Sequence, residues 1–488
     1  MSPSRRFICL FGLFLAARAN PSPNRASLCD LTHTHFPGKV AFPIVPKREL
    51  TPSCVFRPNS TQDVAGFVKL AAANDPCKKH CSVSNPLFAV RSGGHTIWKG
   101  AANTDGGVTV DMRGFDSFSL SSDKKVASIG AGSVFANVYP QLVPHNLTVL
   151  GGRVPGPAAG GFLSGGGKNF LSRRHGFGCD NIYGYEIVLA DGTVTYASAG
   201  HNQDLWLALK GGSNNFGIIT RYDLATYPLS LMWGGTVSLN FTPEVLEAEA
   251  QLFSDLMRPE NFDDAADFGI LLGFADGAFS IDNTMYYSEA VANPPLFANF
   301  TRLPDITATS LALTTVADVV IADGALVPVQ IPRGFELVYA FHNSDSTIYS
   351  QIIKTWQKGI AMIQNLAGLE IHFLIQPMPV TNGTNSLGLP IHDTDLVMGL
   401  LTAYWDNVRD DNTAIGAIQS IVRQHETILQ KQDLLNDYKY LNYADVSQDP
   451  ISSYGKRNIA RLWAASKKYD PKGFWQTRVP GYKLPVSY

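Results

Sequence analysis

The densest glycine segment of the chain covers residues 151–167 and has the sequence GGRVPGPAAGGFLSGGG. Glycine loses more conformational entropy on folding than any other residue, so this density indicates a backbone that must come close to a partner. A flexible linker is the alternative, but valine, proline, phenylalanine and leucine interrupt the glycines, which is unusual for a solvated linker. The segment therefore predicts a surface that contacts a flat or anionic ligand.

A second glycine turn, RSGGHT at residues 91–96, follows the apolar run 87–90. Two adjacent glycines reach backbone conformations that other residues avoid, so their N–H groups can point together at an anion such as a pyrophosphate. His95 then lies at the edge of that anion. Neutral histidine is also a nucleophile, and its pKa near neutrality supplies that form. The turn predicts a dinucleotide cradle with a reactive histidine; a histidine that only contacts the anion is the alternative.

Length and charge limit the class of protein. A chain of 488 residues exceeds what one hydrophobic core usually organises, so two or three domains are expected. The net charge of -2 argues against a nucleic-acid partner, which normally requires a basic excess. Beyond the N-terminal segment no apolar run has membrane length, so we expect a soluble protein without a membrane span.

The first 19 residues read as a secretory signal peptide. Arg5 and Arg6 precede the apolar stretch 7–17, and Ala17-Arg18-Ala19 forms a small-residue cleavage site. A buried N-terminal helix is the alternative. We expect a glycoprotein that is secreted or kept in the secretory pathway or vacuole. The sequons that agree with this route are at Asn59, Asn146, Asn240, Asn299 and Asn382.

Five of the six cysteines remain once the signal peptide is removed with Cys9. In an oxidising compartment we expect two disulfides and one buried thiol. The pairs are Cys29–Cys54 and Cys77–Cys81, and the thiol is Cys179. A zinc site that includes His80, next to Cys81, is the alternative, but no second ligand pair stands at zinc-finger spacing.

The first half of the chain predicts short strands and helices. Residues 20–50 are proline-rich and polar, which indicates a tether. Ser60 is expected to cap a helix, and Ser133 another over residues 134–139. The expected strands are 88–90, 108–111, 126–129 and a hairpin of 185–189 with 194–196. This pattern predicts an α+β domain.

From about residue 229 strand-like segments alternate with helical ones, as expected of a sheet covered by helices. The expected strands are 235–241, 268–274 and 334–341, and the expected helices are 244–257 and 350–366. The last fifty residues return to loops and one amphipathic helix, 458–469. We therefore expect a second domain in the middle of the chain.

Several common nucleotide and catalytic motifs are absent. A Walker A loop ending at Gly167-Lys168 would need glycine at Phe162 and serine or threonine at Asn169. A nicotinamide fingerprint starting at Gly130 fails because Phe135 occupies the third glycine position. No hydrolase elbow, H-E-x-x-H or kinase signature occurs. Hydrolase and kinase functions therefore have no support.

A set of motifs nevertheless occurs in one order along the chain. The motifs are PNSTQDV at 58–64, RSGGH at 91–95, GGG at 165–167, SRRHG at 172–176, CDN at 179–181, GII at 217–219 and YLNYAD at 440–445. With them the chain resembles fungal secreted FAD-linked oxidases of the berberine bridge enzyme-like family, which have a vanillyl-alcohol-oxidase (PCMH-type) FAD domain. The resemblance runs from about Cys54 to Leu484 and is weak in the middle third.

The resemblance implies an α+β fold with a two-part FAD-binding domain and a substrate domain, the latter an antiparallel sheet covered by helices. The FAD domain would comprise residues 29–228 and the C-terminal segment 436–488, and the substrate domain residues 229–435. In this family the histidine that matches His95 is bonded to the flavin 8α-methyl group. Such a link prevents loss of the cofactor outside the cell and raises its reduction potential.

Two positions depart from the relatives. Many relatives have a second covalent link from a cysteine, but Val154 occupies that position here, so a single link through His95 is implied. Phe162 stands where plant relatives have a histidine near the flavin N1. The resemblance therefore leaves open which group stabilises reduced flavin.

The C-terminal motif supplies the catalytic candidates. Tyr440 and Tyr443 match tyrosines that reach the active site in relatives, and Asn442 would bind the cofactor. Such a tyrosine can act as a base or orient a substrate hydroxyl; packing of the tail against the FAD domain is the alternative for Tyr443. No motif locates the glutamate that is the base in some plant relatives. The other expected FAD-binding residues are Arg91, Ser92, Gly93, Gly94, Thr96, Gly160, Gly161, Ser164, Gly165, Gly217 and Ile219.

The function that the resemblance implies is that of an FAD-linked oxidase. The substrate would give a hydride to flavin N5, a base would take a proton, and O2 would reoxidise the flavin to yield peroxide. We expect a monomer that acts on a small secondary metabolite, such as an alcohol, phenol or amine, with or without oxidative cyclisation. A secreted carbohydrate oxidase and a non-catalytic glycan-binding protein on the same scaffold are the alternatives.

Overall fold

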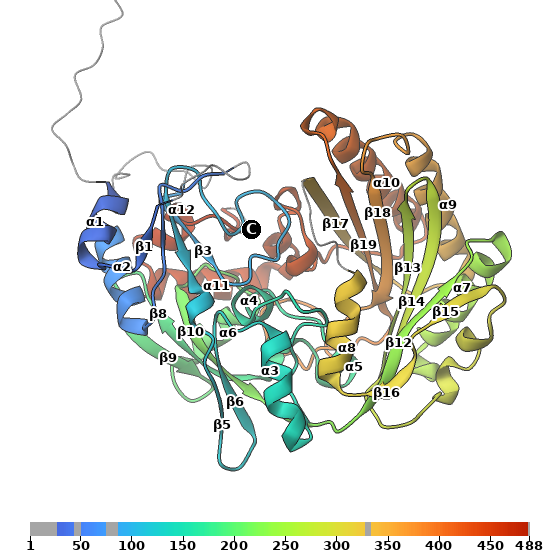
Figure 1. Ribbon diagram of the computed structural model, residues 1–488, viewed down its shortest axis with the longest axis horizontal. Coiled ribbons are helices and arrows are strands. Elements are labelled where there is room, and N and C mark those ends of the chain that lie inside the picture. Colours follow the sequence, from blue (N-terminus) through green and yellow to red (C-terminus); the bar gives the residue numbers. More distant parts are fainter. Residues whose placement is uncertain (1–26, 43–49, 75–85, 327–332, 487–488) are drawn as a thin grey trace, which may run out of the picture.

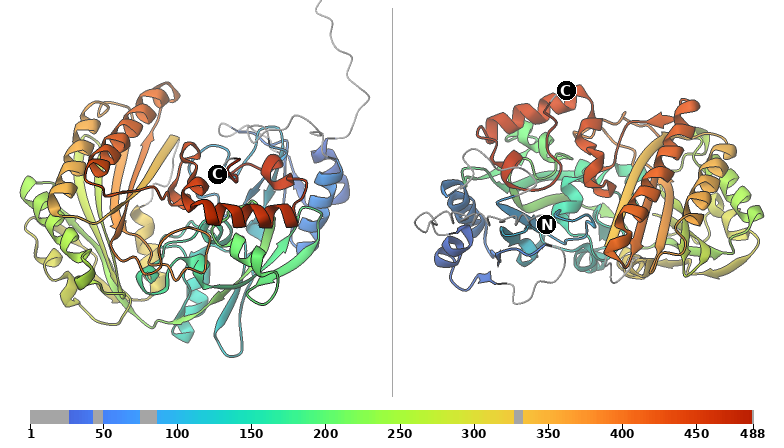
Figure 2. Two further views of the ribbon diagram at one scale, coloured as in Figure 1. Left: turned by 180° about the vertical axis from the view of Figure 1, so that it is seen from behind. Right: turned by 90° about the horizontal axis from the view of Figure 1, so that it is seen from above.

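The computed structural model describes residues 27–42, 50–74, 86–326 and 333–486. The predicted signal peptide, the predicted Cys77–Cys81 pair and His80 lie outside these residues. Figure 1 shows two lobes, of which one contains the first described helix and the C-terminal helices, and the other the middle of the chain. Figure 2 shows that the C-terminal helix α11 (Lys456–Tyr469) lies against the first lobe, far in sequence from its other elements.

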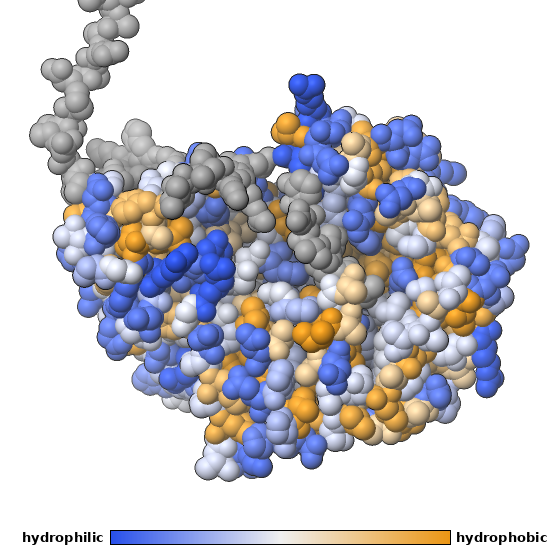
Figure 3. Space-filling view, viewed as in Figure 1, coloured by the Kyte–Doolittle hydropathy of each residue, from blue (hydrophilic) through white to orange (hydrophobic). Residues whose placement is uncertain are grey.

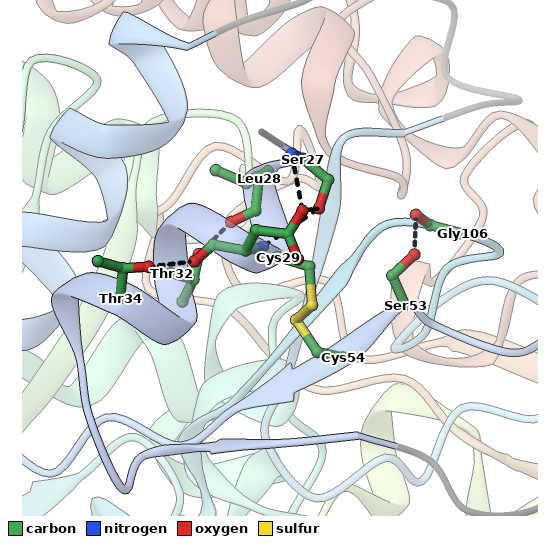
Figure 4. The surroundings of a disulfide bond; sticks show 9 residues. Ser27, Leu28, Cys29, Thr32, Thr34, Ser53, Cys54 and Gly106 are labelled. Atoms are coloured by element: carbon green, nitrogen blue, oxygen red, sulfur yellow. Dashed lines mark hydrogen bonds between the residues drawn. A yellow bond between two sulfur atoms is a disulfide. The ribbon is translucent and has the colours of Figure 1, made fainter. Parts of the chain in front are cut away.

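The N-terminal end of the first lobe contains helix α1 (Leu28–His35). Ser27 caps this helix, because its Oγ accepts a hydrogen bond of 3.1 Å from the Asp30 amide. The disulfide Cys29–Cys54 fastens the helix to the neighbouring strand (Figure 4), which confirms that predicted pair. The prediction of a tether is wrong here, because a capping box and a covalent link hold a short helix that buries little apolar surface.

Two larger sheets frame the first lobe, and β7 and β11 pair separately in a two-stranded antiparallel sheet. The strand order is β1-β2-β4-β3 in one, with β2, β4 and β3 parallel, and β5-β6-β10-β8-β9 in the other, which is antiparallel. The predicted strands and the hairpin in this region are confirmed. The strands are β1 (Val40–Ala41), β2 (Cys54–Phe56), β3 (Phe88–Arg91), β4 (Val108–Asp111), β5 (Phe118–Leu120), β6 (Val126–Gly130), β7 (Leu147–Thr148), β8 (Ile182–Val188), β9 (Val194–Ser198), β10 (Ile218–Ala225) and β11 (Tyr227–Pro228).

The helices of the first lobe are short. Ser60 caps α2 as predicted, since its Oγ accepts a hydrogen bond from the Asp63 amide at 3.2 Å. Ser133 does not cap α3, which begins after Val134 without a side-chain cap. The helices are α2 (Thr61–Ala73), α3 (Phe135–Leu142), α4 (Ala159–Ser164), α5 (Ser172–His175), α6 (Gln203–Leu209), α11 and α12 (Phe474–Arg478).

A nine-stranded antiparallel sheet dominates the second lobe, with the order β15-β12-β14-β13-β18-β19-β17-β20 and β16 beside β12. Its strands are β12 (Met232–Leu239), β13 (Ala266–Ala275), β14 (Ala278–Tyr287), β15 (Ile306–Thr309), β16 (Ala312–Thr314), β17 (Arg333–His342), β18 (Glu370–Pro377), β19 (Leu396–Trp405) and β20 (Leu435–Asn436). Its helices are α7 (Pro243–Leu256), α8 (Val316–Asp323), α9 (Ser346–Ala361) and α10 (Asp411–Lys431).

The two faces of this sheet differ, because successive side chains of a strand point to opposite sides. One face packs on α7, α9 and α10, which lie on the side away from the first lobe in Figure 1. Residues such as Phe268, Leu272, Phe373 and Leu401 form an apolar core there. The other face looks toward the first lobe. This arrangement confirms the predicted α+β class with a helix-covered antiparallel sheet; the domain boundaries remain predictions.

The described helices include none that is both long and apolar enough to cross a membrane. On the face shown in Figure 3, hydrophobic residues are interspersed with hydrophilic ones.

Candidate functional site

A cavity of about 590 Å³ lies between the lobes. Its first wall comes from two glycine-rich segments, residues 91–96 and 151–167, which we call the glycine cradle. Its second wall, which we call the cavity face, comes from the sheet of the second lobe. The cavity-face residues are Leu271, Thr284, Tyr286, Glu336, His372, Leu374, Leu400, Thr402 and Tyr404. The C-terminal segment closes the cavity with Tyr440, Leu441, Asn442, Tyr443 and Tyr482.

Arg91 ends β3 and braces the first turn of the cradle. Its Nη2 donates to Asp111 Oδ2 on the parallel neighbour β4 at 2.7 Å, and Arg113 Nη2 donates to the same oxygen. Burial alone would raise the pKa of Asp111, but the hydrogen bonds from Arg113 and Arg91 lower it to about 2. Arg91 therefore stabilises the turn from behind and does not line the cavity.

The turn itself needs its two glycines. A Cβ on Gly93 would lie 2.9 Å from the carbonyl oxygen of Gly156, and Gly94 has a positive φ of 71°. The Ser92 hydroxyl donates to the carbonyl of Ala131 at 2.6 Å, which ties the turn to the end of β6. The backbone at 92–96 is thereby held open toward the cavity.

His95 follows these glycines and lines the cavity. Its ring is exposed to the cavity, yet the surrounding protein desolvates it and lowers its pKa. The neutral imidazole is therefore the main form at neutral pH. Gly156 packs on this ring, since a Cβ there would lie 3.0 Å from His95 Nδ1.

The second segment of the cradle presents bare backbone. A Cβ on Gly161 would meet nothing within 4 Å, because this residue borders the cavity. A Cβ on Gly165 would instead lie 1.9 Å from Asn442 Oδ1, so this glycine admits the C-terminal segment and does not line the cavity. The cradle thus fits a large, flat ligand that comes close to the main chain, as FAD does, with open backbone for its anionic part.

Tyr440 is a fixed point of the C-terminal segment. Its phenol oxygen accepts hydrogen bonds from the amides of Gly167 and Lys168 at 3.0 and 2.9 Å and from Asn442 Nδ2 at 3.1 Å. Burial raises the pKa of Tyr440 above its usual range. Asn442 also donates to the carbonyl oxygen of Phe162 at 2.9 Å. These contacts hold the tail against the glycine cradle.

Tyr443 belongs to a buried ionic cluster that joins three segments of the chain. Arg153 Nη2 donates to the Tyr443 phenol oxygen at 3.2 Å and to Gln376 Oε1 at 2.9 Å. Arg153 Nη1 donates to Asp267 Oδ2 at 3.1 Å. Lys168 Nζ donates to the other oxygen of Asp267. Burial lowers the pKa of Lys168 to about 8, although Asp267 opposes this shift.

Sequence reasoning missed most of this cluster. Arg153 stands within the glycine-rich segment and Lys168 directly after it, but no spacing links either to a carboxylate. Asp267 is far along the chain and looks like any polar residue at the start of a strand. The position of Arg153 and Lys168 next to glycine pairs and triplets could have marked these two residues. For Asp267 the sequence offers no such signal.

The two departures from the family pattern both lie at the cavity. Val154 and Phe162 line it, and the Phe162 ring packs edge-on against Phe135 at 5.1 Å between centroids. Neither side chain carries a nucleophile or a hydrogen-bond donor.

Most of the predicted site residues come together around this one cavity. Those that line it are Ser92, Gly93, Gly94, His95, Thr96, Gly160, Gly161, Ser164, Gly217, Ile219, Tyr440, Asn442 and Tyr443. Arg91 and Gly165 support it from outside. Cys179 is a buried free thiol, as predicted, and does not line the cavity.

Comparison with known proteins identifies the ligand class of the cradle. Residues 52–198 match the family model described as an FAD binding domain. The chain is 32% identical over 448 residues to the FAD-dependent monooxygenase tpcD of Cochliobolus heterostrophus, a match that covers 88% of this chain and 84% of that protein.

Solved structures share the fold. 6-Hydroxy-D-nicotine oxidase from Arthrobacter nicotinovorans superposes with a TM-score of 0.76 at 21% identity, over 92% of this chain and 98% of that one. Berberine bridge enzyme, in complex with (S)-reticuline, gives 0.73 at 13% identity, over 95% and 99%. The chain therefore belongs to the family of FAD-dependent oxidoreductases that includes the fungal protein tpcD, and it has the fold of berberine bridge enzyme.

Proposed function

We propose that this chain is an FAD-dependent oxidase that acts on a small organic molecule and holds FAD covalently through His95 alone. One observation carries the proposal: a single cavity connects the glycine cradle and His95 with the Tyr443–Arg153 pair. FAD, when bound, supplies the group that accepts two electrons from the substrate. The chain's own residues hold the cofactor, take the proton of the substrate and shape the cavity.

His95 is suited to bond formation because its imidazole is neutral and open to the cavity. A neutral imidazole nitrogen has the free electron pair that attack at the flavin 8α carbon requires. Such a bond would replace one hydrogen of the 8α-methyl group and the N–H hydrogen of the imidazole; both would leave as protons, and the two electrons would pass through the flavin to O2. Val154 has no nucleophile, so His95 is the single attachment point that we propose.

Tyr443 is the better candidate for the base. Its oxygen lies at hydrogen-bond distance from the buried Arg153 guanidinium, which stabilises negative charge developing there. Tyr440 is held by three donors, and burial disfavours its ionised form. We therefore assign proton removal from the substrate to Tyr443 and the positioning of the tail to Tyr440.

The substrate that we propose is a secondary metabolite with a mainly apolar skeleton. Leu271, Leu374 and Leu400 form the middle of the cavity face. A sugar presents hydroxyl groups on every side, and those that faced this leucine row would lack partners. This lining supports an aromatic or polyketide-like substrate over the carbohydrate alternative.

Two experiments test the assignment of the cofactor and of the base. Acid-precipitated wild-type protein should stay yellow and yield one flavin-linked peptide that contains His95, whereas His95→Ala should release its flavin. His201→Ala, at an exposed histidine, should behave like wild type. A covalent flavin in His95→Ala would overturn the attachment site.

Tyr443→Phe should keep its flavin and lose about 10²-fold or more in kcat.

The names of the relatives favour a second candidate, a monooxygenase. An oxidase removes two electrons and two protons from its substrate and converts O2 to hydrogen peroxide. A monooxygenase instead places one oxygen atom of O2 in the product. Turnover under 18O2 separates the two: unlabelled product with one equivalent of peroxide supports the oxidase, and labelled product overturns it.

We also propose passage through the secretory pathway. The five sequon asparagines are exposed, which is a requirement for glycan attachment. The Cys29–Cys54 disulfide is of the kind that persists in oxidising compartments. Expression in a fungal host should give protein in the medium or vacuole that loses mass on endoglycosidase treatment; a cytosolic, unglycosylated protein would contradict this.

A further inference from the structure

The cavity face has two polar ends and an apolar middle. Its rows follow from the ladder of β18, β19 and β17, in which Leu374 pairs with Leu400 and His372 pairs with Thr402. Thr402 in turn pairs with Glu336 on β17. One end of the face therefore carries His372, Thr402 and Glu336, and leucines follow next to it.

The other polar end is the cluster around Arg153. Gln376, four residues from His372 on β18, receives a hydrogen bond from Arg153 there. Four residues of strand span about 13 Å at about 3.3 Å per residue. Tyr443 and Lys168 lie at this same end through their contacts with Arg153 and Asp267.

Glu336 is the unusual residue at the first end. Its side chain lines the cavity and the residue is 8% exposed. Within the part of the chain that the structure describes, no group hydrogen-bonds the carboxyl of Glu336. The carboxyl group therefore has its free hydrogen-bonding positions open to the cavity, where a ligand can supply the partner that the protein does not.

The surroundings of Glu336 favour its protonated form. Burial raises the pKa of Glu336 well above its usual range, and the neighbouring Asp445 raises it further. Asp445 is already engaged, because it accepts hydrogen bonds from the amide and the hydroxyl of Ser447 at 2.9 and 2.7 Å. A neutral carboxyl group can both donate and accept a hydrogen bond.

We propose that Glu336 is a specificity-determining residue that binds, as a neutral acid, an oxygen substituent at the far end of an elongated, mainly apolar substrate. This inference rests on the proposed function, in which Tyr443, beside Arg153, takes the proton of the substrate. The substrate class is then a fused-ring or polyketide-like molecule with oxygen at both ends. An amine at the Arg153 end is disfavoured, because Arg153 and Lys168 place two cations beside the single carboxylate of Asp267.

The test compares the binding of two probes to wild type and to variants. The flavin-loaded enzyme is reduced beforehand and kept without oxygen, so that no turnover occurs. The probes are 2,6-dihydroxynaphthalene, with oxygen at both ends, and 2-naphthol, with oxygen at one. Calorimetry gives Kd for each with wild type, Glu336→Leu, Glu336→Gln and the exposed-site control Glu260→Gln. We expect wild type and the control to bind the dihydroxy compound about tenfold more tightly.

Glu336→Leu should remove this preference by weakening the dihydroxy compound alone, whereas Glu336→Gln should keep it, since an amide also donates and accepts. Equal binding of both probes by wild type would overturn the proposal, as would an unchanged preference in Glu336→Leu. Should Glu336→Leu fail to fold, loss of the preference in Glu336→Gln would still contradict a neutral acid. The oxidase proposal fails separately, through the 18O2 experiment, because binding to reduced enzyme involves no turnover.

Discussion

The glycine cradle and the cavity face are two walls of one cavity, but different physical constraints fix them. In the cradle the main chain makes the contacts, so the identity of single residues is dictated by space: Gly93 and Gly165 have no room for a Cβ, and Gly94 needs a positive φ. On the cavity face side chains make the contacts, and a residue such as Leu374 or Thr402 can be exchanged without changing the backbone. We therefore propose that the cradle selects the cofactor and that the cavity face selects the substrate.

We expect the largest loss of stability from a substitution at Asp267, where the two walls are joined. Asp267 of the sheet binds Arg153 of the cradle and Lys168, which directly follows the cradle, and the Asp267 side chain is 1% exposed. Asp267→Leu leaves the buried Lys168 and the mostly buried Arg153 without their carboxylate, so the free energy of unfolding should fall by about 3–5 kcal/mol. Denaturant titration of the flavin-loaded protein measures this.

The matched control is Asp264→Leu, which removes a carboxylate that is 47% exposed and paired with Arg174. A surface pair contributes about 1 kcal/mol or less. Replacing Lys168 by Met in the Asp267→Leu background should recover part of the loss. Equal losses for Asp267→Leu and Asp264→Leu would show that the ionic cluster does not couple the lobes.

The sequence predicts the cradle far better than the cavity face. Residues 91–96 are contiguous, and their glycines mark a backbone requirement that is visible without neighbours. The cavity face collects residues from five strands between Leu271 and Tyr404, and each strand has an ordinary alternating pattern. Which Glu, Thr and Leu share a row depends on strand register, which no local motif encodes. The helix α1 escaped prediction although its disulfide was expected, because its eight residues bury only Cys29 and Thr32 and so show no apolar face in the sequence.

Within the cradle, alanine substitutions at Gly165 and Gly161 distinguish an effect on packing from an effect on cofactor binding. A Cβ on Gly165 would overlap Asn442 Oδ1, so Gly165→Ala should lower the free energy of unfolding by about 3 kcal/mol. A Cβ on Gly161 meets no protein atom and enters the cavity. Gly161→Ala should therefore leave the apoprotein as stable as wild type and reduce flavin content. Thermal denaturation and the flavin-to-protein absorbance ratio measure the two effects, and a Gly161→Ala protein with full flavin content would contradict a cradle.

The pH dependence of stability tests the ion pairs that Asp111 forms with Arg91 and Arg113 behind the turn. Its pKa of about 2 in the folded protein lies below the ordinary 3.8, so its stabilising contribution is present above pH 3.8 and is lost as the pH falls through 2. Asp111→Asn should lower the free energy of unfolding by about 2 kcal/mol at pH 7. The difference from wild type should disappear near pH 2. Denaturation of both proteins between pH 2 and 7 gives the curve; a constant difference would rule out ionisation of Asp111 as its cause.

For Glu336, the carboxyl group of the cavity face, we expect stability to change with pH in the opposite direction to Asp111. The pKa of Glu336 is raised, so the folded protein binds more protons than the unfolded chain above pH 4.5, and wild-type stability falls as the pH rises. Glu336→Gln cannot ionise, so it should match wild type at pH 4 and exceed it at pH 8 by on the order of 1 kcal/mol. Glu260→Gln, at an exposed site, should show no such trend. If the stability of wild type instead rose relative to that of Glu336→Gln with increasing pH, Glu336 would be a carboxylate in the folded protein. The cavity face would then select a cationic substituent instead of a neutral oxygen.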